Sequence, residues 1–376
     1  MYATQSLQDI LFLILYGGVA MLALVAGIYM GLRRNNGIIA DVLPSTALRR
    51  WTAAFFIMSA LSHVWWYVLG VYWLTDDRLV RNIVAVNLDH VALVPLVMAL
   101  LLHMLQDRRR WLWPWVLAQV PIAVFAGMGI ATHSEFYGLE ATAYWQLAVM
   151  VVFSAYYIFA LIQYGRWLHN NYADLEHKEV WQSLLFVVVL FVVYEIYFTN
   201  PGEMAREYLA QFNTIVIIVF LLWRVESLQQ LDDVKEDEEG AIVVEAPTEA
   251  DGAESASLPI PSNIGALLHK YCEVPRLYLQ HDLTLAQLSE RIGTNRTYLG
   301  SYFVQQGTTY NVYINRLRIE YFEQAYIKAI DSDRPFTAQQ LAFKCGFRSY
   351  STFSTAFKQF KGQTVTAWIK SRTPKE

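Results

Sequence analysis

The chain has 376 residues, of which 55% are apolar, 15% aromatic and only 16% charged. An average soluble protein has more charged and fewer apolar residues, so this composition excludes an ordinary soluble chain. The length predicts more than one domain. The two cysteines, Cys272 and Cys345, lack zinc-like spacing. They predict reduced cytosolic thiols and no metal site.

Charge is unevenly distributed along the chain. Residues 1–225 carry a net charge of −1, residues 226–262 carry −10 and residues 263–376 carry +7, so the overall −4 hides a basic carboxy-terminal domain. A basic helical domain is the expected electrostatic footprint of a protein that binds nucleic acid.

Residues 1–225 predict a helical membrane domain. They contain seven apolar stretches of about 20 residues, which is the length needed to cross a bilayer. These stretches cover residues 9–32, 51–74, 83–106, 111–131, 143–165, 180–199 and 208–225. No basic residue precedes the first stretch, and its apolar run is too long for a cleaved signal peptide. We therefore expect it to be an anchor.

Positive charge in the connections predicts the orientation of this domain. The basic residues gather in every second connection, at Arg33, Arg34, Arg49, Arg50, Arg108, Arg109, Arg110, Arg166 and Lys178. Because such connections stay in the cytosol, the amino terminus is expected outside. Seven crossings then place everything after Arg224 in the cytosol. The predicted location is a bacterial inner (cytoplasmic) membrane, with a multi-pass topology.

Residues 226–262 predict an acidic linker. The stretch begins as a plausible extension of the seventh helix and continues as GAIVVEAPTEADGAESASLPIP, which has no apolar period. Such a composition predicts disorder. The acidic run would either act as a solvated spacer or compete with DNA for the basic domain that follows.

The stretch 336–361 predicts a helix-turn-helix. A helix over 337–344 ends at Gly346, since glycine accepts the positive φ of a tight turn. A second helix follows over about 350–360, with Phe353, Phe357 and Phe360 at helical spacing. Its other face is polar and basic. In this arrangement the second helix enters a DNA major groove.

The same pattern of helix, glycine turn and helix occurs about fifty residues earlier, over 283–304. Leu285, Leu288 and Ile292 line one helix, Gly293 turns the chain, and a second helix follows. Between the two motifs, residues 310–330 predict one long helix with a buried apolar stripe. The whole chain is therefore expected to be all-α: a seven-helix bundle followed by a soluble, two-part, homeodomain-like domain over 263–376.

Residues 264–369 resemble the AraC-type transcription regulators. The resemblance is carried by YLGSYFVQQGTTYNVYINRLRIE and LAFKCGFRSYSTFSTAFKQFKGQT. Phe322 replaces a small Ala, Val365 replaces a Pro, and Gly300 and Ser301 are small at outer-face positions that often carry long polar side chains. The resemblance implies binding to double-stranded DNA and control of transcription. It implies nothing about residues 1–225, which usual family members lack.

The outer faces of the two second helices predict the DNA contacts. Arg296, Arg348, Lys358 and Lys361 are expected to neutralise phosphates, which positions the protein without reading sequence. Side chains expected to reach base edges are Thr297, Tyr298, Ser301, Tyr350, Ser351, Thr352 and Thr355. The alternative is that these residues form an ordinary solvated helix face.

Polar residues inside the predicted bundle suggest a second site. His63, Asp89, His90 and Glu195 lie within apolar stretches, where ionisable groups are costly and usually face the bundle interior. We expect an outward-open pocket, walled by aromatic residues, for an unknown extracytoplasmic small molecule or peptide. Alternatively, these groups pair with each other or lie among lipid headgroups.

The sequence lacks the motifs of several other functional classes. Histidine spacing does not suit haem, the seventh helix has no lysine for a retinal Schiff base, and no catalytic or phosphate-binding motif occurs. No enzyme activity and no cofactor are expected. The sequence therefore predicts a membrane-tethered transcription regulator, with a homodimer as a possible state. The alternatives are a membrane receptor or transporter with a cytosolic protein-binding helical tail, and an integral-membrane enzyme.

Overall fold

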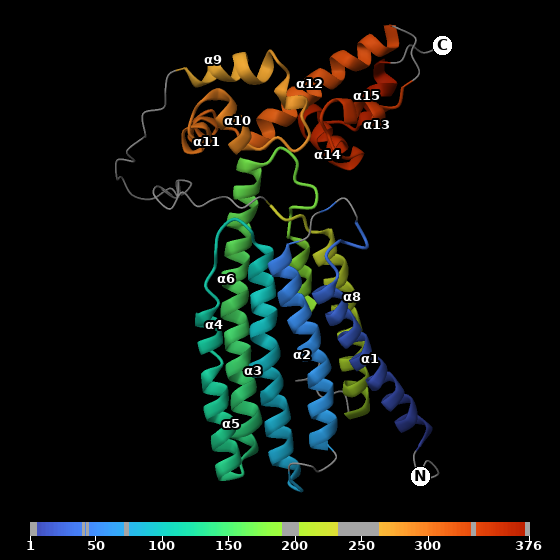
Figure 1. Ribbon diagram of the computed structural model, residues 1–376, viewed down its shortest axis with the longest axis vertical. Coiled ribbons are helices and arrows are strands. Elements are labelled where there is room, and N and C mark those ends of the chain that lie inside the picture. Colours follow the sequence, from blue (N-terminus) through green and yellow to red (C-terminus); the bar gives the residue numbers. More distant parts are fainter. Residues whose placement is uncertain are drawn as a thin grey trace. The chain divides into compact units, whose positions relative to one another are not determined.

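A computed structural model of the chain describes residues 6–39, 42, 45–70, 75–189, 203–231, 263–331 and 336–372. The chain forms two compact units (Figure 1). The amino-terminal unit comprises Met1–Tyr164 and His177–Asp233, and the carboxy-terminal unit comprises Gly165–Glu176 and Val234–Glu376. Every regular element in the described ranges is a helix. The predicted all-α class therefore agrees with the structure.

The amino-terminal unit is built from long apolar helices. Their bounds are α1 (Leu7–Leu32), α2 (Thr46–Gly70), α3 (Arg78–Met104), α4 (Trp113–Leu117), α5 (Val120–Thr132), η1 (Phe136–Glu140), α6 (Ala141–Asn171) and α8 (Glu203–Ser227). The last residues of α6 belong to the carboxy-terminal unit. Within the described ranges, six segments are long and apolar enough to cross a membrane. The second half of the expected span 180–199 lies outside those ranges, so the count of seven stays a prediction.

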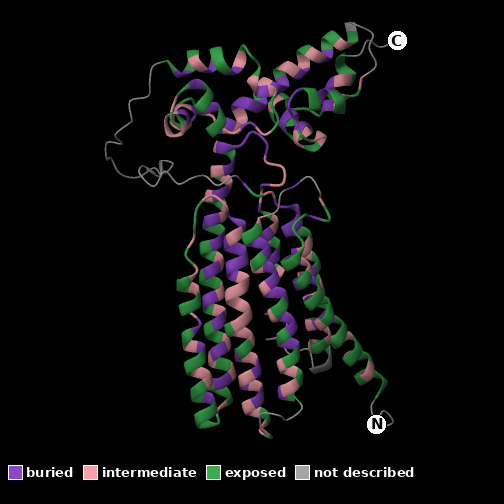
Figure 2. Cartoon of the chain, viewed as in Figure 1, coloured by how far each residue is buried: buried purple, intermediate pink, exposed green. Residues whose placement is uncertain are grey.

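Local sequence signals start these helices. Ser6 and Asp9 form a capping box at the start of α1, and the Asp77 carboxylate accepts two backbone N–H groups at the start of α3. Exposed residues run along α1, α2, α5, α6 and α8, whereas α3 is mostly buried or half-buried (Figure 2). Many are large and apolar, including Ile14, Val64, Val124, Val152, Phe159 and Phe212. So much exposed apolar surface is unfavourable in water and indicates association with a membrane.

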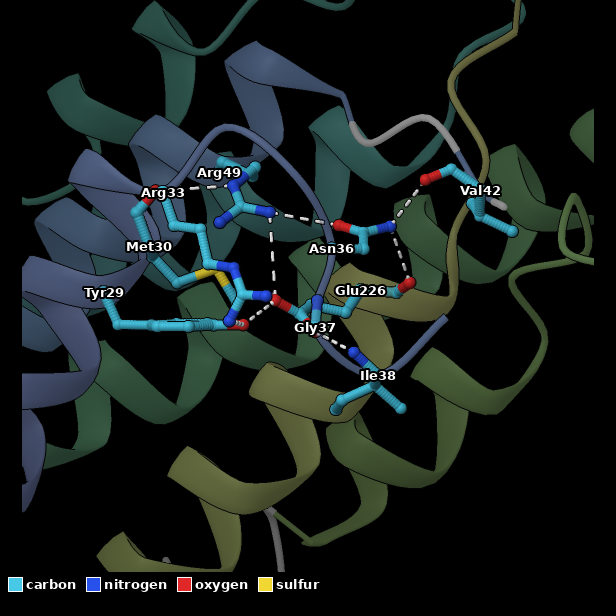
Figure 3. Close-up of polar contacts among 9 residues, drawn as sticks. All are labelled: Tyr29, Met30, Arg33, Asn36, Gly37, Ile38, Val42, Arg49 and Glu226. Atoms are coloured by element: carbon cyan, nitrogen blue, oxygen red, sulfur yellow. Dashed lines mark hydrogen bonds and ion pairs between the residues drawn. The ribbon is translucent and has the colours of Figure 1, made fainter. Parts of the chain in front are cut away.

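A buried carboxylate joins the ends of three helices in this unit (Figure 3). Glu226, near the end of α8, is fully buried and accepts hydrogen bonds from the Tyr29 hydroxyl of α1 and from two backbone N–H groups of the α1–α2 connection. Its Oε1 lies 3.8 Å from Nη1 of Arg49 in α2. Asn36 Nδ2 donates to the Glu226 carbonyl at 2.9 Å. These contacts fix the end of the last apolar helix.

The chain stays packed beyond α8. Leu228 and Leu231 are buried, and the Gln106 side chain bonds the backbone of Gln229 and Leu231. Residues 226–231, where the sequence allows an extension of the last apolar helix, therefore pack with the bundle, because these two leucines join its apolar core. The remainder of the expected linker, 232–262, lies outside the described residues.

The carboxy-terminal unit contains shorter helices around two apolar clusters. The bounds are α9 (Ile264–Leu268), η2 (His269–Glu273), η3 (Leu277–Leu279), α10 (Leu285–Ile292), α11 (Arg296–Gln305), α12 (Tyr310–Asp331), α13 (Ala338–Lys344), α14 (Tyr350–Lys361) and α15 (Val365–Arg372). One cluster holds α10 and α11 against the first half of α12. The other holds α13, α14 and α15 against its second half.

Two fully buried residues of α12 hold these clusters: Phe322 lies within the second cluster, and Arg318 connects the second cluster with the first. Phe322 is fully buried, and its ring lies 4.5 Å from that of Phe353. The Arg318 guanidinium is also fully buried, and its Nε donates to the Tyr278 carbonyl at 2.7 Å. It also lies 5.5 Å from the Phe347 ring centroid. Since Tyr278 precedes α10 and Phe347 follows α13, Arg318 fixes how the two helix pairs are related.

Candidate nucleic-acid interface

The first helix-turn-helix consists of α10 and α11. Thr284 and Gln287 form a capping box that starts α10, and Gly293 ends it with φ of 71°. The Asn295 side chain accepts from the Thr297 N–H and starts α11. Leu299 and Phe303 are buried. Local signals therefore aim one face of α11 at the core and leave the other for a partner.

The second helix-turn-helix, α13 and α14, repeats this construction. Thr337 and Gln340 form a capping box, Gly346 turns the chain with φ of 92°, and the Ser349 hydroxyl accepts from the Thr352 N–H at 3.2 Å. Phe353 is fully buried on the inner face. Both recognition helices, α11 and α14, thus lie where the sequence predicts them.

The outer face of α14 is accessible and polar. Ser351, Thr355 and Lys358 are exposed, whereas Tyr350 and Thr352 are half-buried. An open hollow runs along this face and is lined by Ser354, Thr355, Lys358 and Gln359. Sequence reasoning missed Ser354 and Gln359, although their helical spacing from Thr355 and Lys358 could have revealed them.

The basic residues beside α14 have acidic neighbours. Arg348 is exposed and forms an ion pair with Asp282. Lys361 Nζ lies 2.8 Å from Glu323 Oε2. Both pairs are partly solvated, and such pairs are weak, so phosphate groups could replace the carboxylates at little cost.

The outer face of α11 is more covered. Arg296, Thr297, Tyr298 and Ser301 are all half-buried. Arg296 donates from Nε and Nη2 to the Asn171 side-chain oxygen, at 2.9 and 2.5 Å. Loss of water around the guanidinium lowers the pKa of Arg296. No sequence signal pairs residues so far apart.

The residues of the expected pocket are only partly brought together. The Asp89 carboxylate accepts from the Ser62 hydroxyl at 2.6 Å and from the indole N–H groups of Trp65 and Trp66. Three donors from one neighbouring helix account for much of its hydrogen-bonding capacity. These hydrogen bonds join α3 to α2 at Asp89.

The other pocket residues lie in different surroundings. His63 lies 3.0 Å from the Gln211 side chain of α8 and 2.8 Å from the Ser59 carbonyl. The Nδ1 atom of His90 is buried without a hydrogen-bond partner among the described residues. Glu195 lies outside the described ranges. No group of three or more metal-ligating side chains occurs in the ranges described.

Comparison with known proteins assigns a class to one part of the chain. Residues 288–371 match the family model described as a helix-turn-helix domain. Two of the similar curated proteins are uncharacterized HTH-type transcriptional regulators of Staphylococcus aureus, strains COL and MSSA476. Each is 30% identical over 98 residues, which is 26% of this chain and 12% of the relative. No solved structure matches significantly.

The family match indicates a DNA-binding helix-turn-helix domain over residues 288–371. It covers the second helix-turn-helix, the linker helix and most of the first. The chain spans about an eighth of the length of the curated relatives it matches, and the match lies outside the amino-terminal unit.

Proposed function

We propose that the protein is a membrane-tethered, sequence-specific transcription regulator that binds double-stranded DNA through α11 and α14. The observation that carries this proposal is a pair of capped helix-turn-helix motifs on one linker helix, in a chain whose described ranges contain six segments able to cross a membrane. Arg318 holds the two motifs in one orientation. They would read neighbouring major-groove segments about one helical turn apart on one face of DNA.

Different side chains would have different roles on DNA. Arg296, Arg348, Lys358 and Lys361 would contact phosphates, which adds affinity for every sequence and makes binding sensitive to salt. Exposed hydroxyl groups at Ser351 and Thr355 would reach base edges first. Thr297, Tyr298, Ser301, Tyr350 and Thr352 would complete the reading surface.

Membrane insertion would follow the positive charge of the connections. The amino terminus would lie outside and the carboxy-terminal unit in the cytosol of a bacterium, where DNA is accessible. Two copies in one bilayer would have a high local concentration, which favours a homodimer on paired half-sites. His63, Asp89, His90 and Glu195 remain the candidate sensor residues for an extracytoplasmic ligand.

The end of α8 is the simplest place for a signal to leave the bundle. The buried contacts of Glu226 connect α8 with both α1 and α2. A ligand that changed the packing of these helices would change the surroundings of this carboxylate. The chain then continues from Leu231 into the segment that leads to the DNA-binding domain.

Selection from a random duplex library tests the proposal. The full chain in detergent micelles is expected to enrich a defined sequence at physiological salt. Arg348→Ala should weaken binding to every sequence and reduce the salt slope by about 1, whereas Thr352→Ala should change the preferred base at one position by about 1–3 kcal/mol. Lys370→Ala removes an exposed charge outside both motifs and serves as the control.

An absence of any enriched sequence would contradict the proposal. Equal loss of affinity by Arg348→Ala and Thr352→Ala on all sequences would show instead that the two roles are assigned wrongly.

A further inference from the structure

One segment of the carboxy-terminal unit comes from far upstream in the chain. Residues 171–176, which we call the docking segment, begin at the last residue of α6 and pack in the same compact unit as the two helix-turn-helix motifs. Ala173 is 1% exposed within the apolar cluster of the first motif, and Asp174 is 2% exposed. This burial shows that the segment is an integrated part of the unit.

Polar contacts hold the docking segment on the first motif and the linker helix. Tyr172 forms an antiparallel bridge with Thr284, at the start of α10. Asn311 Nδ2 donates to the Ala173 carbonyl at 2.8 Å and to the Tyr172 carbonyl at 3.2 Å. Asn315 Nδ2 also donates to the Ala173 carbonyl, at 3.2 Å. Side-chain amides thus recognise the backbone of the segment.

The segment also contacts side chains expected to bind DNA. Asn171 accepts two hydrogen bonds from Arg296, at the start of α11. The Glu176 carboxylate lies 3.5 Å from the Thr352 hydroxyl, in the first turn of α14. One short acidic segment therefore reaches the first turn of both recognition helices. The Glu176 carboxylate at the start of α14 occupies a place suited to phosphate, because the amino-terminal end of a helix favours negative charge.

We propose that the docking segment is an intramolecular inhibitor that occupies the DNA-reading surface and must leave before DNA binds. While Nε and Nη2 of Arg296 donate to Asn171, that edge of the guanidinium cannot hold a phosphate. This inference rests on the proposed DNA-binding function and names its regulation. The segment follows an apolar helix directly, so movement of α6 would be passed to it along a continuous helix.

A charged side chain at the buried position 173 should release the docking segment from the two helix-turn-helix motifs. In the full chain, Ala173→Glu places a carboxylate where the side chain is 1% exposed, and an unpaired buried charge is strongly unfavourable. His169→Glu adds the same charge at an exposed position on the end of α6 and is the matched control. The probe is a duplex selected from a random library. We expect Ala173→Glu to bind it roughly tenfold more tightly than wild type, because charged hydrogen bonds to Arg296 no longer compete.

A reversible cross-link provides the opposite test. Cysteines replacing the bridged pair, Tyr172→Cys and Thr284→Cys, lie close enough for a disulfide. Burial raises the pKa of the native Cys272 and Cys345 thiols to about 12, so they should resist oxidation. We expect the oxidised double variant to bind the probe at least about tenfold more weakly than its reduced form.

The outcomes separate the inhibitor from the DNA-binding function. Tight probe binding by the cross-linked protein, or failure of the disulfide to form, overturns the inhibitor and leaves the proposed function standing. If neither reduced protein nor Ala173→Glu enriches any sequence, the proposed function itself fails. Tighter binding by Ala173→Glu but not by His169→Glu, with loss on cross-linking, supports the inhibitor.

Discussion

The two helix-turn-helix motifs begin alike and end in different surroundings. Both start with a threonine–glutamine capping box and turn at a glycine with positive φ. The first motif shares its apolar cluster with Ala173 and holds Asn171 through Arg296. The second presents an open, polar helix face along α14. The same local signals, a capping box and a turn glycine, therefore define each motif. Long-range packing decides which recognition helix is accessible.

The turns of the two motifs differ in the same way. At Gly293 an added Cβ would meet no atom within 4 Å. At Gly346 it would lie 2.8 Å from the Leu279 carbonyl oxygen and 3.0 Å from Arg318 Nε. The second turn is thus packed against the segment that precedes the first motif, and the first turn is open.

The largest expected effect comes from a substitution that should destabilise the second apolar cluster more than the first. Phe322→Ala removes a fully buried ring that lies among Phe353, Phe357 and Trp368. Truncation of a buried phenylalanine costs about 3–5 kcal/mol. Amide hydrogen exchange should show lost protection in α13, α14 and α15, with less change in α10 and α11.

Ile327→Ala, at an exposed position on the same helix, is the control and should change stability little. Equal loss of protection in both motifs would show that the clusters unfold as one unit. It would contradict the proposed difference between the two motifs.

Alanine at the two turn glycines should give unequal losses. Both positions have positive φ, which costs a residue with a Cβ about 1–2 kcal/mol. Gly346→Ala adds a clash with backbone and a buried guanidinium, so we expect about 2–4 kcal/mol there. Thermal unfolding of the two variants measures the difference. Equal melting temperatures would contradict the tight contact at Gly346.

The capping boxes should instead behave alike. Thr284→Ala and Thr337→Ala each remove one side-chain acceptor from a helix start. Each loss is expected to cost about 1 kcal/mol. Local hydrogen exchange in α10 and α13 measures this. A much larger cost at Thr284 would show that its bridge with Tyr172 contributes through the side chain as well.

The smallest effect is a pH dependence confined to the first motif. The Glu273 carboxylate accepts from His269 Nδ1 and from the Tyr313 hydroxyl, both at 2.8 Å, and these bonds lower the pKa of Glu273. A lowered carboxyl pKa contributes stability above the usual carboxyl range. That contribution is lost as the pH falls through the lowered pKa.

Glu273→Gln should therefore destabilise the first motif by less than about 1 kcal/mol near neutral pH. Melting curves between pH 7 and pH 3 should show that the gap in melting temperature between wild type and variant becomes smaller in acid. A gap that widens in acid would contradict the assigned cause.

Sequence alone determined the elements whose rules are local. Glycine positions, threonine caps and apolar spacing predicted both motifs and the linker helix, and the ends of α14 and α12 lie within one residue of expectation. Apolar length predicted the membrane-capable helices. These features depend on residues a few positions apart, so they can be read in order along the chain.

Only the tertiary structure decided what covers each site. The contacts of Arg296 with Asn171 and of Tyr29 with Glu226 join residues more than a hundred positions apart. The tertiary structure also gave the partners of Asp89, which accepts from Ser62 and two tryptophans. Such pairings follow from how helices pack, and the composition of either partner does not specify them, because many polar residues could satisfy the same donor.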